Sequence, residues 1–270
     1  MKLFYCFLLC LTVSVSSNAQ PDSAKVQRYI FEARYQLDST DADKISTENF
    51  FLDVSSNNSS RFASEGKLIR DSVTRYWSAQ LAAGAKSVNI TKTISSKFNF
   101  EIVKDATGKI TYRNNAGGEY YYYDEDLANI SWKILPGFED YHGMKTQKAT
   151  ANYAGRTWFV LFTNAIPLIE GPYKFKNLPG FVVKAWDSRN HYIFSFVQSK
   201  VLTVFFDTKL SPKSMKVTKA QLNKAIYNYR SKPLFREGVK FLGGDTVKEE
   251  REKAHREKLK RENNWIELTD

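Results

Sequence analysis

The side chains that could bind a metal ion are few and widely separated in the sequence. The chain has three histidines, His142, His191 and His255, and no two of them have the spacing of metal ligands on one helix or loop. Glu139 and Asp140 precede His142, but this run matches no known cation-binding loop. The sequence therefore predicts no metal site and no cofactor.

The residues that could act as nucleophiles also lack a catalytic context. The sequence contains no G-x-S-x-G motif, no P-loop and no G-x-G-x-x-G motif. Both cysteines, Cys6 and Cys10, lie in the apolar N-terminal segment. We therefore assign no catalytic residue, and a hydrolase-type enzyme ranks third among the functions considered.

The best-placed polar and aromatic side chains flank a Gly-Pro corner in the stretch "GRTWFVLFTNAIPLIEGPYKFKNLPGFVV", residues 155–183. Two cations beside this corner could contact an anion, and neighbouring aromatic rings could supply an apolar surface. In the alternative, the arginine pairs with an acid and the lysine covers apolar surface with its stem. The predicted ligand-binding residues are Arg156, Trp158, Tyr173, Lys174 and Phe175.

Four consecutive tyrosines, Tyr120–Tyr123, stand among acidic residues in the run "EYYYYDEDL". Their rings could form a platform for a carbohydrate or a peptide, because aromatic faces stack on apolar surfaces. In the alternative, they alternate along one strand, so that half of them enter the core and half lie on the surface.

Most of the chain between residues 26 and 207 has the composition and turn chemistry of β-strands. Turn sequences such as "DATG" at 105–108 and "DSRN" at 187–190 separate aromatic and β-branched runs. The connections are mostly too short for crossover helices, so we expect antiparallel pairing. The expected strands include 26–37, 50–54, 97–105, 110–114, 131–135, 146–153, 156–163, 181–187, 191–200 and 201–207.

Three segments have helical character. Residues 66–84 have apolar positions at roughly helical spacing and end in a glycine. Thr218 is the expected N-cap of a second helix that stops before Pro233, with Leu222, Ile226 and Tyr229 facing the sheet. The charged run 246–263 predicts a solvated helix, frayed or partly disordered, with a partner-binding tail as the alternative.

The first residues have the organisation of a secretory signal peptide. Lys2 gives a basic start, residues 3–15 are apolar, and Ser17-Asn18-Ala19 forms a small-x-small cleavage site. We expect cleavage after Ala19 and export through the Sec pathway to the periplasm or the extracellular space. No later stretch reaches membrane-spanning length, so we expect a soluble mature protein, at most peripheral to a membrane.

The formal net charge of +11 and the pI near 9.4 indicate anionic partners. The basic residues are spread along the chain and no RNA-binding aromatic motif is present, so a nucleic-acid partner is excluded from the prediction. An exported basic protein meets anionic lipid headgroups or acidic glycans instead.

The stretch 155–183 resembles the signature of the GLPGLI family, secreted or periplasmic proteins of Gram-negative Bacteroidetes. Asn177 stands in place of the first glycine of the naming hexapeptide, Phe181 and Val182 replace Leu and Ile, and Thr146 lies near where the family often has a cysteine. Asparagine tolerates left-handed backbone, so the turn can be retained. The resemblance implies the fold of the family and no particular activity. The residues that match or fill the structural motif are Gly155, Ile166, Pro167, Gly171, Pro172, Asn177, Leu178, Pro179 and Gly180.

Four hydroxyl residues follow an aspartate and precede a small or aliphatic residue. Exported proteins of the bacterial group that the resemblance implies carry O-glycans at such positions. The hypothetical glycosylation sites are Ser23, Ser39, Ser72 and Thr246.

Together these observations predict an α+β fold: a curved, mostly antiparallel β-sheet, with a half-barrel as one form of it, helices on one face and a charged C-terminal helix. The expected organisation is a signal peptide (1–19), a single β-rich GLPGLI-like domain (20–245) and a charged C-terminal helical tail (246–270). The leading function is a non-catalytic exported binding protein for an apolar or anionic cell-envelope ligand. The alternative is a structural or protein-interaction component of the envelope with no small ligand.

Overall fold

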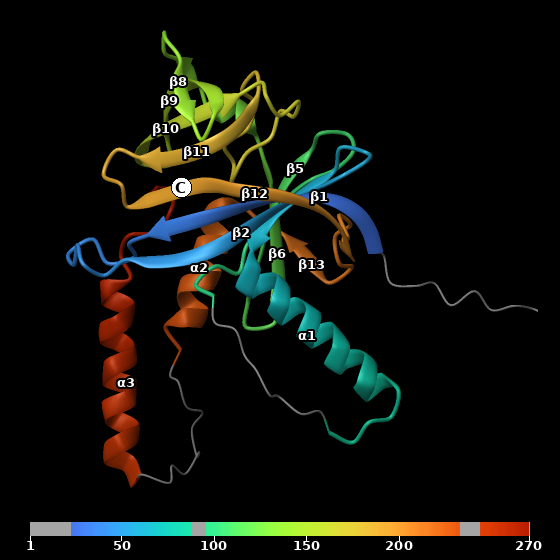
Figure 1. Cartoon of the computed structure of the whole chain (residues 1–270). Coiled ribbons are helices and arrows are strands. Elements are labelled where there is room, and N and C mark those ends of the chain that lie inside the picture. Colours follow the sequence, from blue (N-terminus) through green and yellow to red (C-terminus); the bar gives the residue numbers. More distant parts are fainter. Residues whose placement is uncertain (1–22, 88–95, 233–243, 270) are drawn as a thin grey trace, which may run out of the picture.

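The described residues form one curved, open β-sheet with three α-helices (Figure 1). The computed structural model describes residues 23–87, 96–232 and 244–269, so the predicted signal peptide lies outside the described residues. The strands are β1 (Ser23–Tyr35), β2 (Ser46–Ser55), β3 (Ser60–Ser64), β4 (Glu101–Lys104), β5 (Ile110–Ala116), β6 (Glu119–Glu125), β7 (Lys133–Ile134), β8 (Glu139–Tyr141), β9 (Met144–Tyr153), β10 (Arg156–Thr163), β11 (Phe181–Asp187), β12 (Tyr192–Phe205) and β13 (Ser214–Lys216).

The order of strands in the sheet is β13-β6-β5-β4-β3-β2-β1-β12-β11-β10-β9-β7, and β8 pairs with β9 beside this path. The pairs are antiparallel, apart from the short parallel pair of β13 with β6. The fold-class prediction of a curved, mostly antiparallel sheet with helices is therefore confirmed.

Local turn chemistry accounts for the hairpins. Ala154 and Gly155 both have positive φ, 48° and 78°, which is the backbone that a tight β9–β10 turn requires. In the β11–β12 turn, Asp187 accepts a hydrogen bond from the backbone N–H of Tyr192, and Asn190 takes φ 55°.

The prediction of two strands over 191–200 and 201–207 is wrong, because β12 runs unbroken from Tyr192 to Phe205. It pairs along the whole length of β1, with one register shift between Ile30 and Phe31. No glycine or proline interrupts it, so nothing in the backbone ends the strand.

The three helices lie below the sheet in the view of Figure 1. Helix α1 (Glu65–Ala82) begins at the N-cap Ser64, and α2 (Lys219–Arg230) begins at Thr218, which forms a capping box with Gln221. Leu222 is buried as expected, but Tyr229 is 48% exposed. Helix α3 (Gly244–Arg261) carries the charged run, and η1 (Leu127–Asn129) is a short 3-10 turn. No helix in the described ranges is long and apolar enough to span a membrane.

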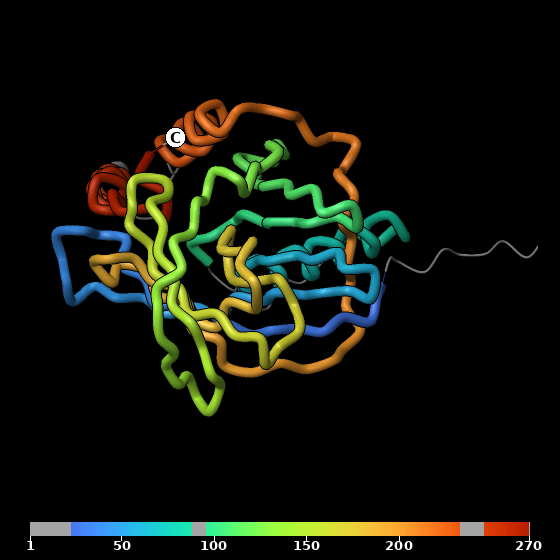
Figure 2. The backbone as a smooth tube through the Cα atoms, turned by 90° about the horizontal axis from the view of Figure 1, so that it is seen from above, coloured from blue at the N-terminus to red at the C-terminus, as the bar shows by residue number. Residues whose placement is uncertain are grey.

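The core is a cluster of aromatic rings inside the curve of the sheet. Phe50 and Phe62 from neighbouring strands stack with ring centroids 5.2 Å apart, and Phe194 meets both of them edge-on. Figure 2 shows that the long β10–β11 connection lies within the hollow of the sheet. Tyr173 and Phe175 of this connection belong to the core, so the connection fills the sheet from inside.

The prediction of a helical tail over 246–270 is wrong for its last residues. Helix α3 ends at Arg261, and the C-terminal segment, defined here as residues 262–269, then packs against the core. Asn264 and Ile266 are only 3% and 6% exposed. The apolar Trp265 and Ile266, which follow the charged run, provide the burial that a solvated tail would lack.

Candidate functional site

The β10–β11 connection holds its shape because backbone groups approach each other closely. A Cβ atom on Gly171 would lie 2.2 Å from the carbonyl oxygen of Phe175, and one on Gly180 would lie 2.6 Å from that of Thr163. Asn177 takes a left-handed φ of 64°, as expected for a residue in place of glycine. Tyr173 also has positive φ, 54°, so the chain turns sharply just before Lys174.

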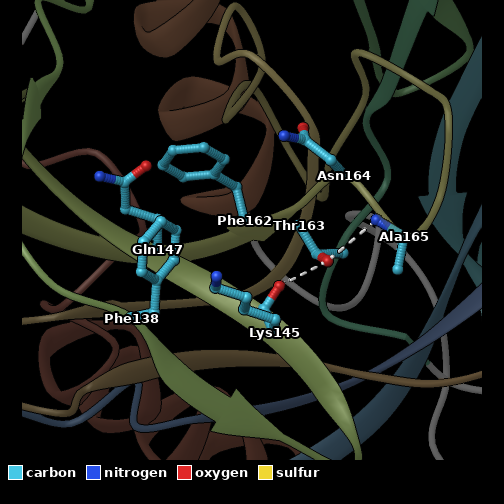
Figure 3. Close-up of a pocket in the computed structure, with 7 residues that line it drawn as sticks. All are labelled: Phe138, Lys145, Gln147, Phe162, Thr163, Asn164 and Ala165. Atoms are coloured by element: carbon cyan, nitrogen blue, oxygen red, sulfur yellow. Dashed lines mark hydrogen bonds between the residues drawn. The ribbon is translucent and has the colours of Figure 1, made fainter.

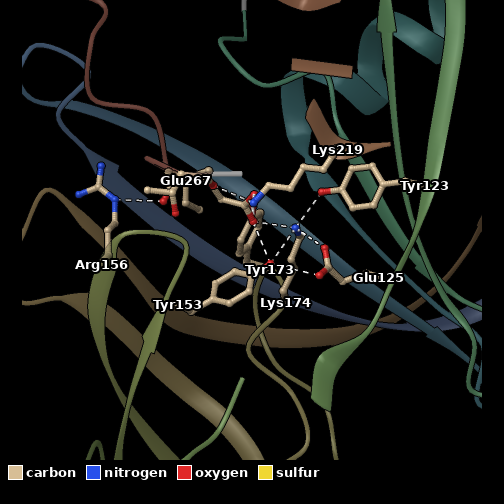
Figure 4. A network of polar contacts seen from close by, with 10 residues as sticks. Tyr123, Glu125, Tyr153, Arg156, Tyr173, Lys174, Lys219 and Glu267 are labelled. Carbon is tan, nitrogen blue, oxygen red and sulfur yellow. Dashed lines mark hydrogen bonds and ion pairs between the residues drawn. The ribbon is translucent and has the colours of Figure 1, made fainter. Parts of the chain in front are cut away.

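This turn directs Lys174 into the protein, where its side chain is fully buried (Figure 4). Its Nζ donates to Oη of Tyr123 at 2.9 Å and of Tyr153 at 3.0 Å. It also pairs with the carboxylates of Glu125 and Glu267, and lies 2.6 Å from Oε1 of the latter. The ammonium group is therefore enclosed by acids and phenols of the protein itself.

Glu267 joins this network to the C-terminal segment. Its Oε1 accepts a 2.6 Å hydrogen bond from the hydroxyl of Tyr173, and its Oε2 lies 2.9 Å from the ammonium of Lys219 on α2. Burial alone would raise the pKa of Glu267, but the positive charges of Lys174 and Lys219 lower it to about 2. Burial and the charge of Glu267 together raise the pKa of Tyr173 well above its ordinary value.

Arg156 holds the same segment through its backbone. Its guanidinium donates to the carbonyl oxygens of Trp265 and Ile266 and to the side-chain oxygen of Asn264. It also forms a 3.0 Å ion pair with Asp187. Arg156 is 6% exposed, so its guanidinium N–H groups donate to groups inside the protein.

A second lysine of the connection is also buried. Lys176 is 3% exposed and pairs with Glu170, which in turn lies 2.5 Å from the ammonium of Lys104. Burial would raise the pKa of Glu170, and the two lysines lower it below its ordinary range.

A cavity of about 920 Å³ lies beside the network around Lys174. Helices α2 and α3, the C-terminal segment, β5 and the residues before β4 surround it, and Glu267 and Tyr173 are shared between cavity and network. Its size falls in the range of small-molecule sites. The apolar floor, as we call it here, consists of Phe98, Phe100, Tyr112, Tyr173, Trp265 and Ile266.

The rim of the cavity is cationic. Two acids of the described residues also line the cavity: Glu267 is held by Lys174 and Lys219, and Glu262 by Lys97 and Arg230. Because the rim carries more lysine and arginine than acid, its potential favours anions. The cationic rim consists of Lys97, Arg230, Lys232 and Lys258, and His255 also lines the cavity.

One partly buried carboxylate, that of Glu48, interacts with a serine of the cavity wall. Burial raises the pKa of Glu48, and the hydroxyls of Ser96 and Ser64 partly offset this. Ser96 lines the cavity, whereas Glu48 is not part of its wall. In the part of the chain that the structure describes, no cluster of three or more histidine, cysteine, aspartate or glutamate side chains could hold a metal ion.

A second, smaller hollow of about 320 Å³ lies near β8, β9 and β10 (Figure 3). Lys145 lies over the ring of Phe138 at 3.9 Å, and Thr163 bonds the backbone of Lys145 and Ala165. It offers one cation and little apolar area. The larger cavity is therefore the stronger candidate site.

The five residues predicted to bind a ligand are brought into one region, but as buried groups. Arg156 pairs with an acid, as the alternative interpretation expected, and with backbone oxygens, whereas Lys174 is fully buried among acids and phenols rather than covering apolar surface with its stem. Trp158 and Phe175 pack together at 4.4 Å in the core. Only Tyr173 also lines the cavity. Ligand binding by these five residues therefore stays a prediction, and Tyr173 is the one among them that lines the cavity.

Other predicted residues are dispersed. Of the four tyrosines only Tyr123 reaches the network, while Tyr120 is 45% exposed. His255 lines the cavity, and His142 and His191 lie elsewhere. The hypothetical glycosylation sites Ser23, Ser39, Ser72 and Thr246 are all exposed, and their modification stays a prediction.

Sequence reasoning missed Glu125, Glu267 and most of the cavity wall. Glu125 could not be singled out, since it is one acid in an acidic run. A signal did exist for Glu267: the apolar pair Trp265 and Ile266 stands isolated after a long charged helix.

The comparisons with known proteins support the fold and show neither a family nor an activity. No protein-family model matches the chain, and no curated protein matches it. Two solved structures of PNGF-II, in space groups P21 and C2, are similar to it with TM-scores of 0.53 and 0.52 at 13% and 12% identity. The matches cover 81% and 80% of this chain but only 38% and 37% of the PNGF-II chains. This likeness supports the curved-sheet architecture.

Proposed function

We propose that this chain is an exported, non-catalytic binding protein with a GLPGLI-like fold, and that its cavity takes an apolar ligand that bears an anionic group. The observation that carries the proposal is the pairing of the aromatic floor with the cationic rim in one cavity of about 920 Å³. Apolar surface removes the body of such a ligand from water, and the rim attracts its charged end.

The network around Lys174 supports this function by making the floor rigid. Tyr173 and Glu267 both line the cavity; the hydroxyl of Tyr173 donates to Glu267, and Glu267 is held in turn by the ammonium of Lys174. A site whose side chains are fixed before binding loses less entropy when the ligand enters. The buried ion pairs thus serve as the support of the site rather than as its contact surface.

The test is binding of palmitate, measured by native mass spectrometry and isothermal titration calorimetry on the full mature chain. Ile226 on α2 lines the cavity and is half-buried, so Ile226→Trp should fill it and weaken binding by about tenfold or more. The matched control is Val201→Trp on β12, where the valine is 56% exposed and far along the sheet.

Native mass spectra of the protein from its own cell envelope provide the second readout. A consistently ligand-free protein that also fails to bind palmitate would overturn the proposal, as would equal binding by the Ile226→Trp and Val201→Trp variants.

The alternative, an envelope interaction component with no small ligand, has its own observation. Helix α1 exposes Tyr76 (62%) and Leu81 (51%), large apolar side chains that a partner could cover. Copurification of an envelope protein that is lost on Tyr76→Ser, together with an empty cavity, would favour this function.

A further inference from the structure

Three cations meet on one wall of the cavity around a single carboxylate. Glu262, the first residue after α3, pairs through Oε1 with Nζ of Lys97 at 2.5 Å and through Oε2 with the guanidinium of Arg230. The ammonium of Lys97 lies so close to Lys258 that it lowers the pKa of Lys258. The carboxylate of Glu262 is thus shared by a cluster that carries more positive charge than it can neutralise.

Among the described residues, no other acid of the cavity wall relieves this cluster. The second lining acid, Glu267, is already engaged by Lys174 and Lys219. The side chain of Glu262 is 9% exposed, whereas those of Lys97 and Arg230 are 33% and 27% exposed. The two cations are therefore more accessible than the carboxylate that bridges them.

The cluster borders the apolar floor directly. The guanidinium of Arg230 lies 4.3 Å from the ring of Trp265, and Lys97 is adjacent in sequence to the buried Phe98. A ligand whose charged end sat at Glu262 would place its apolar part on these rings. The cations therefore lie as close to the apolar floor as a lipid headgroup lies to the first carbons of its own acyl chain.

We propose that Glu262 occupies the place of the ligand's anionic headgroup, and that the headgroup is a phosphate monoester which displaces Glu262 from Arg230 and Lys97. This inference rests on the proposed function and specifies its ligand. One arginine guanidinium and two lysine ammonium groups offer many donors and an excess of positive charge. A phosphate, with its several oxygens and double negative charge, matches them better than a single carboxylate does.

The experiment compares three palmitoyl amphiphiles and one headgroup without a chain. The probes are 1-palmitoyl lysophosphatidate, palmitate, neutral monopalmitoylglycerol and glycerol 3-phosphate, titrated by calorimetry into the full mature chain. We expect the lysophosphatidate to bind about tenfold more tightly than monopalmitoylglycerol, and glycerol 3-phosphate to bind far more weakly than either.

The deciding variant is Glu262→Gln, which keeps the shape but removes the competing charge. It should tighten lysophosphatidate binding several-fold and leave monopalmitoylglycerol unchanged. The matched control is Glu257→Gln, an acid on α3 that pairs with Lys260 and does not line the cavity. Lys97→Met should weaken lysophosphatidate binding, because it removes one of the cations that would hold the headgroup. This second variant keeps the test valid if Glu262→Gln fails to fold.

The outcomes separate this inference from the proposed function. If all three amphiphiles bind with equal affinity and Glu262→Gln behaves like Glu257→Gln, the headgroup inference is overturned while the binding function stands. If none of them binds, the proposed function fails. Tight binding of glycerol 3-phosphate alone would point to a free phosphate ester as ligand and would also overturn the inference.

Discussion

At the scale of single residues, Lys174 shows how a surface residue type becomes a core group. A lysine beside a Gly-Pro corner looks like an exposed cation, because lysine is almost never fully buried unless it is paired. Here its partners Glu125 and Glu267 come from strand β6 and the C-terminal segment. Its ammonium also lies 4.9–5.6 Å from the rings of four tyrosines, which favours a cation at this position.

Replacing Lys174 by methionine should destabilise the fold by about 3–5 kcal/mol, because the buried carboxylate of Glu125 loses its cation and that of Glu267 keeps only Lys219. Adding Glu267→Gln to Lys174→Met should cost less than the sum of the single changes, since the two groups interact directly. Urea unfolding of the three variants measures this. Lys216→Met, at an exposed lysine that pairs with Asp124, is the control and should keep the wild-type midpoint. Additive effects of the two core changes would show that the pair is not coupled.

The carboxyl of Glu267 should also make stability depend on acid pH. Its pKa falls from 4.5 in the unfolded chain to about 2 in the fold, so the stability it supplies is complete above about pH 4.5. That contribution, about 3 kcal/mol, is lost as the pH decreases from 4.5 towards 2. The unfolding free energy of Glu267→Gln should therefore change less over this range than that of the wild type. Parallel pH curves for the two proteins would contradict this assignment.

At the scale of elements, the β10–β11 connection is a rigid insert and not an open loop. Its glycines are needed for space: Gly171 and Gly180 lack positive φ, and added Cβ atoms would meet backbone oxygens. Its left-handed positions are filled by Tyr173 and Asn177 instead. The connection therefore fixes both its aromatic side chains and its two lysines inside the sheet.

Gly180→Ala should cost about 1–3 kcal/mol or more, because the new methyl group would lie 2.6 Å from the Thr163 oxygen and 2.8 Å from Oδ1 of Asn164. Asn177→Gly in the same connection is the matched control, since glycine adopts φ 64° without strain. Thermal unfolding of both variants should show a large decrease for the first and a small change for the second. Equal melting temperatures would mean that the backbone near Gly180 can move aside.

The same connection shows what the sequence could and could not predict. The turns at 154–155 and 187–190 and the N-cap at Thr218 depend on neighbouring residues, and the pattern predicted them correctly. The burial of Lys174 depends on Glu267, which is 93 residues away, and no local pattern contains that information. The cavity is likewise built from β5, two helices and the chain end, so it could not be predicted from any one stretch.

At the scale of the whole molecule, the end of the chain holds the open sheet together. The C-terminal segment crosses from α3 to the β9–β10 turn, where the N–H of Leu268 donates to the oxygen of Ala154. On the way Asn264 bonds the backbone of Gln36 and Leu37, and Tyr192 donates to the Asn264 oxygen. The segment thus links the end of β1 to β10 and β12, as well as to the network around Lys174.

A chain that stops after Arg261 should therefore lose its native packing, even though it keeps every strand. It would leave Lys174 with one carboxylate instead of two and would remove the Arg156 contacts with residues 264–266. Each such loss costs up to about 3–5 kcal/mol, and together they approach the whole stability of an ordinary domain. The near-UV circular dichroism should weaken, and amide exchange in β1 and β12 should accelerate. A chain that stops after Leu268 keeps these contacts and should unfold near the wild-type temperature. Cooperative, wild-type unfolding of the shorter chain would instead mean that the segment is a dispensable tail resting on a sheet that is stable without it.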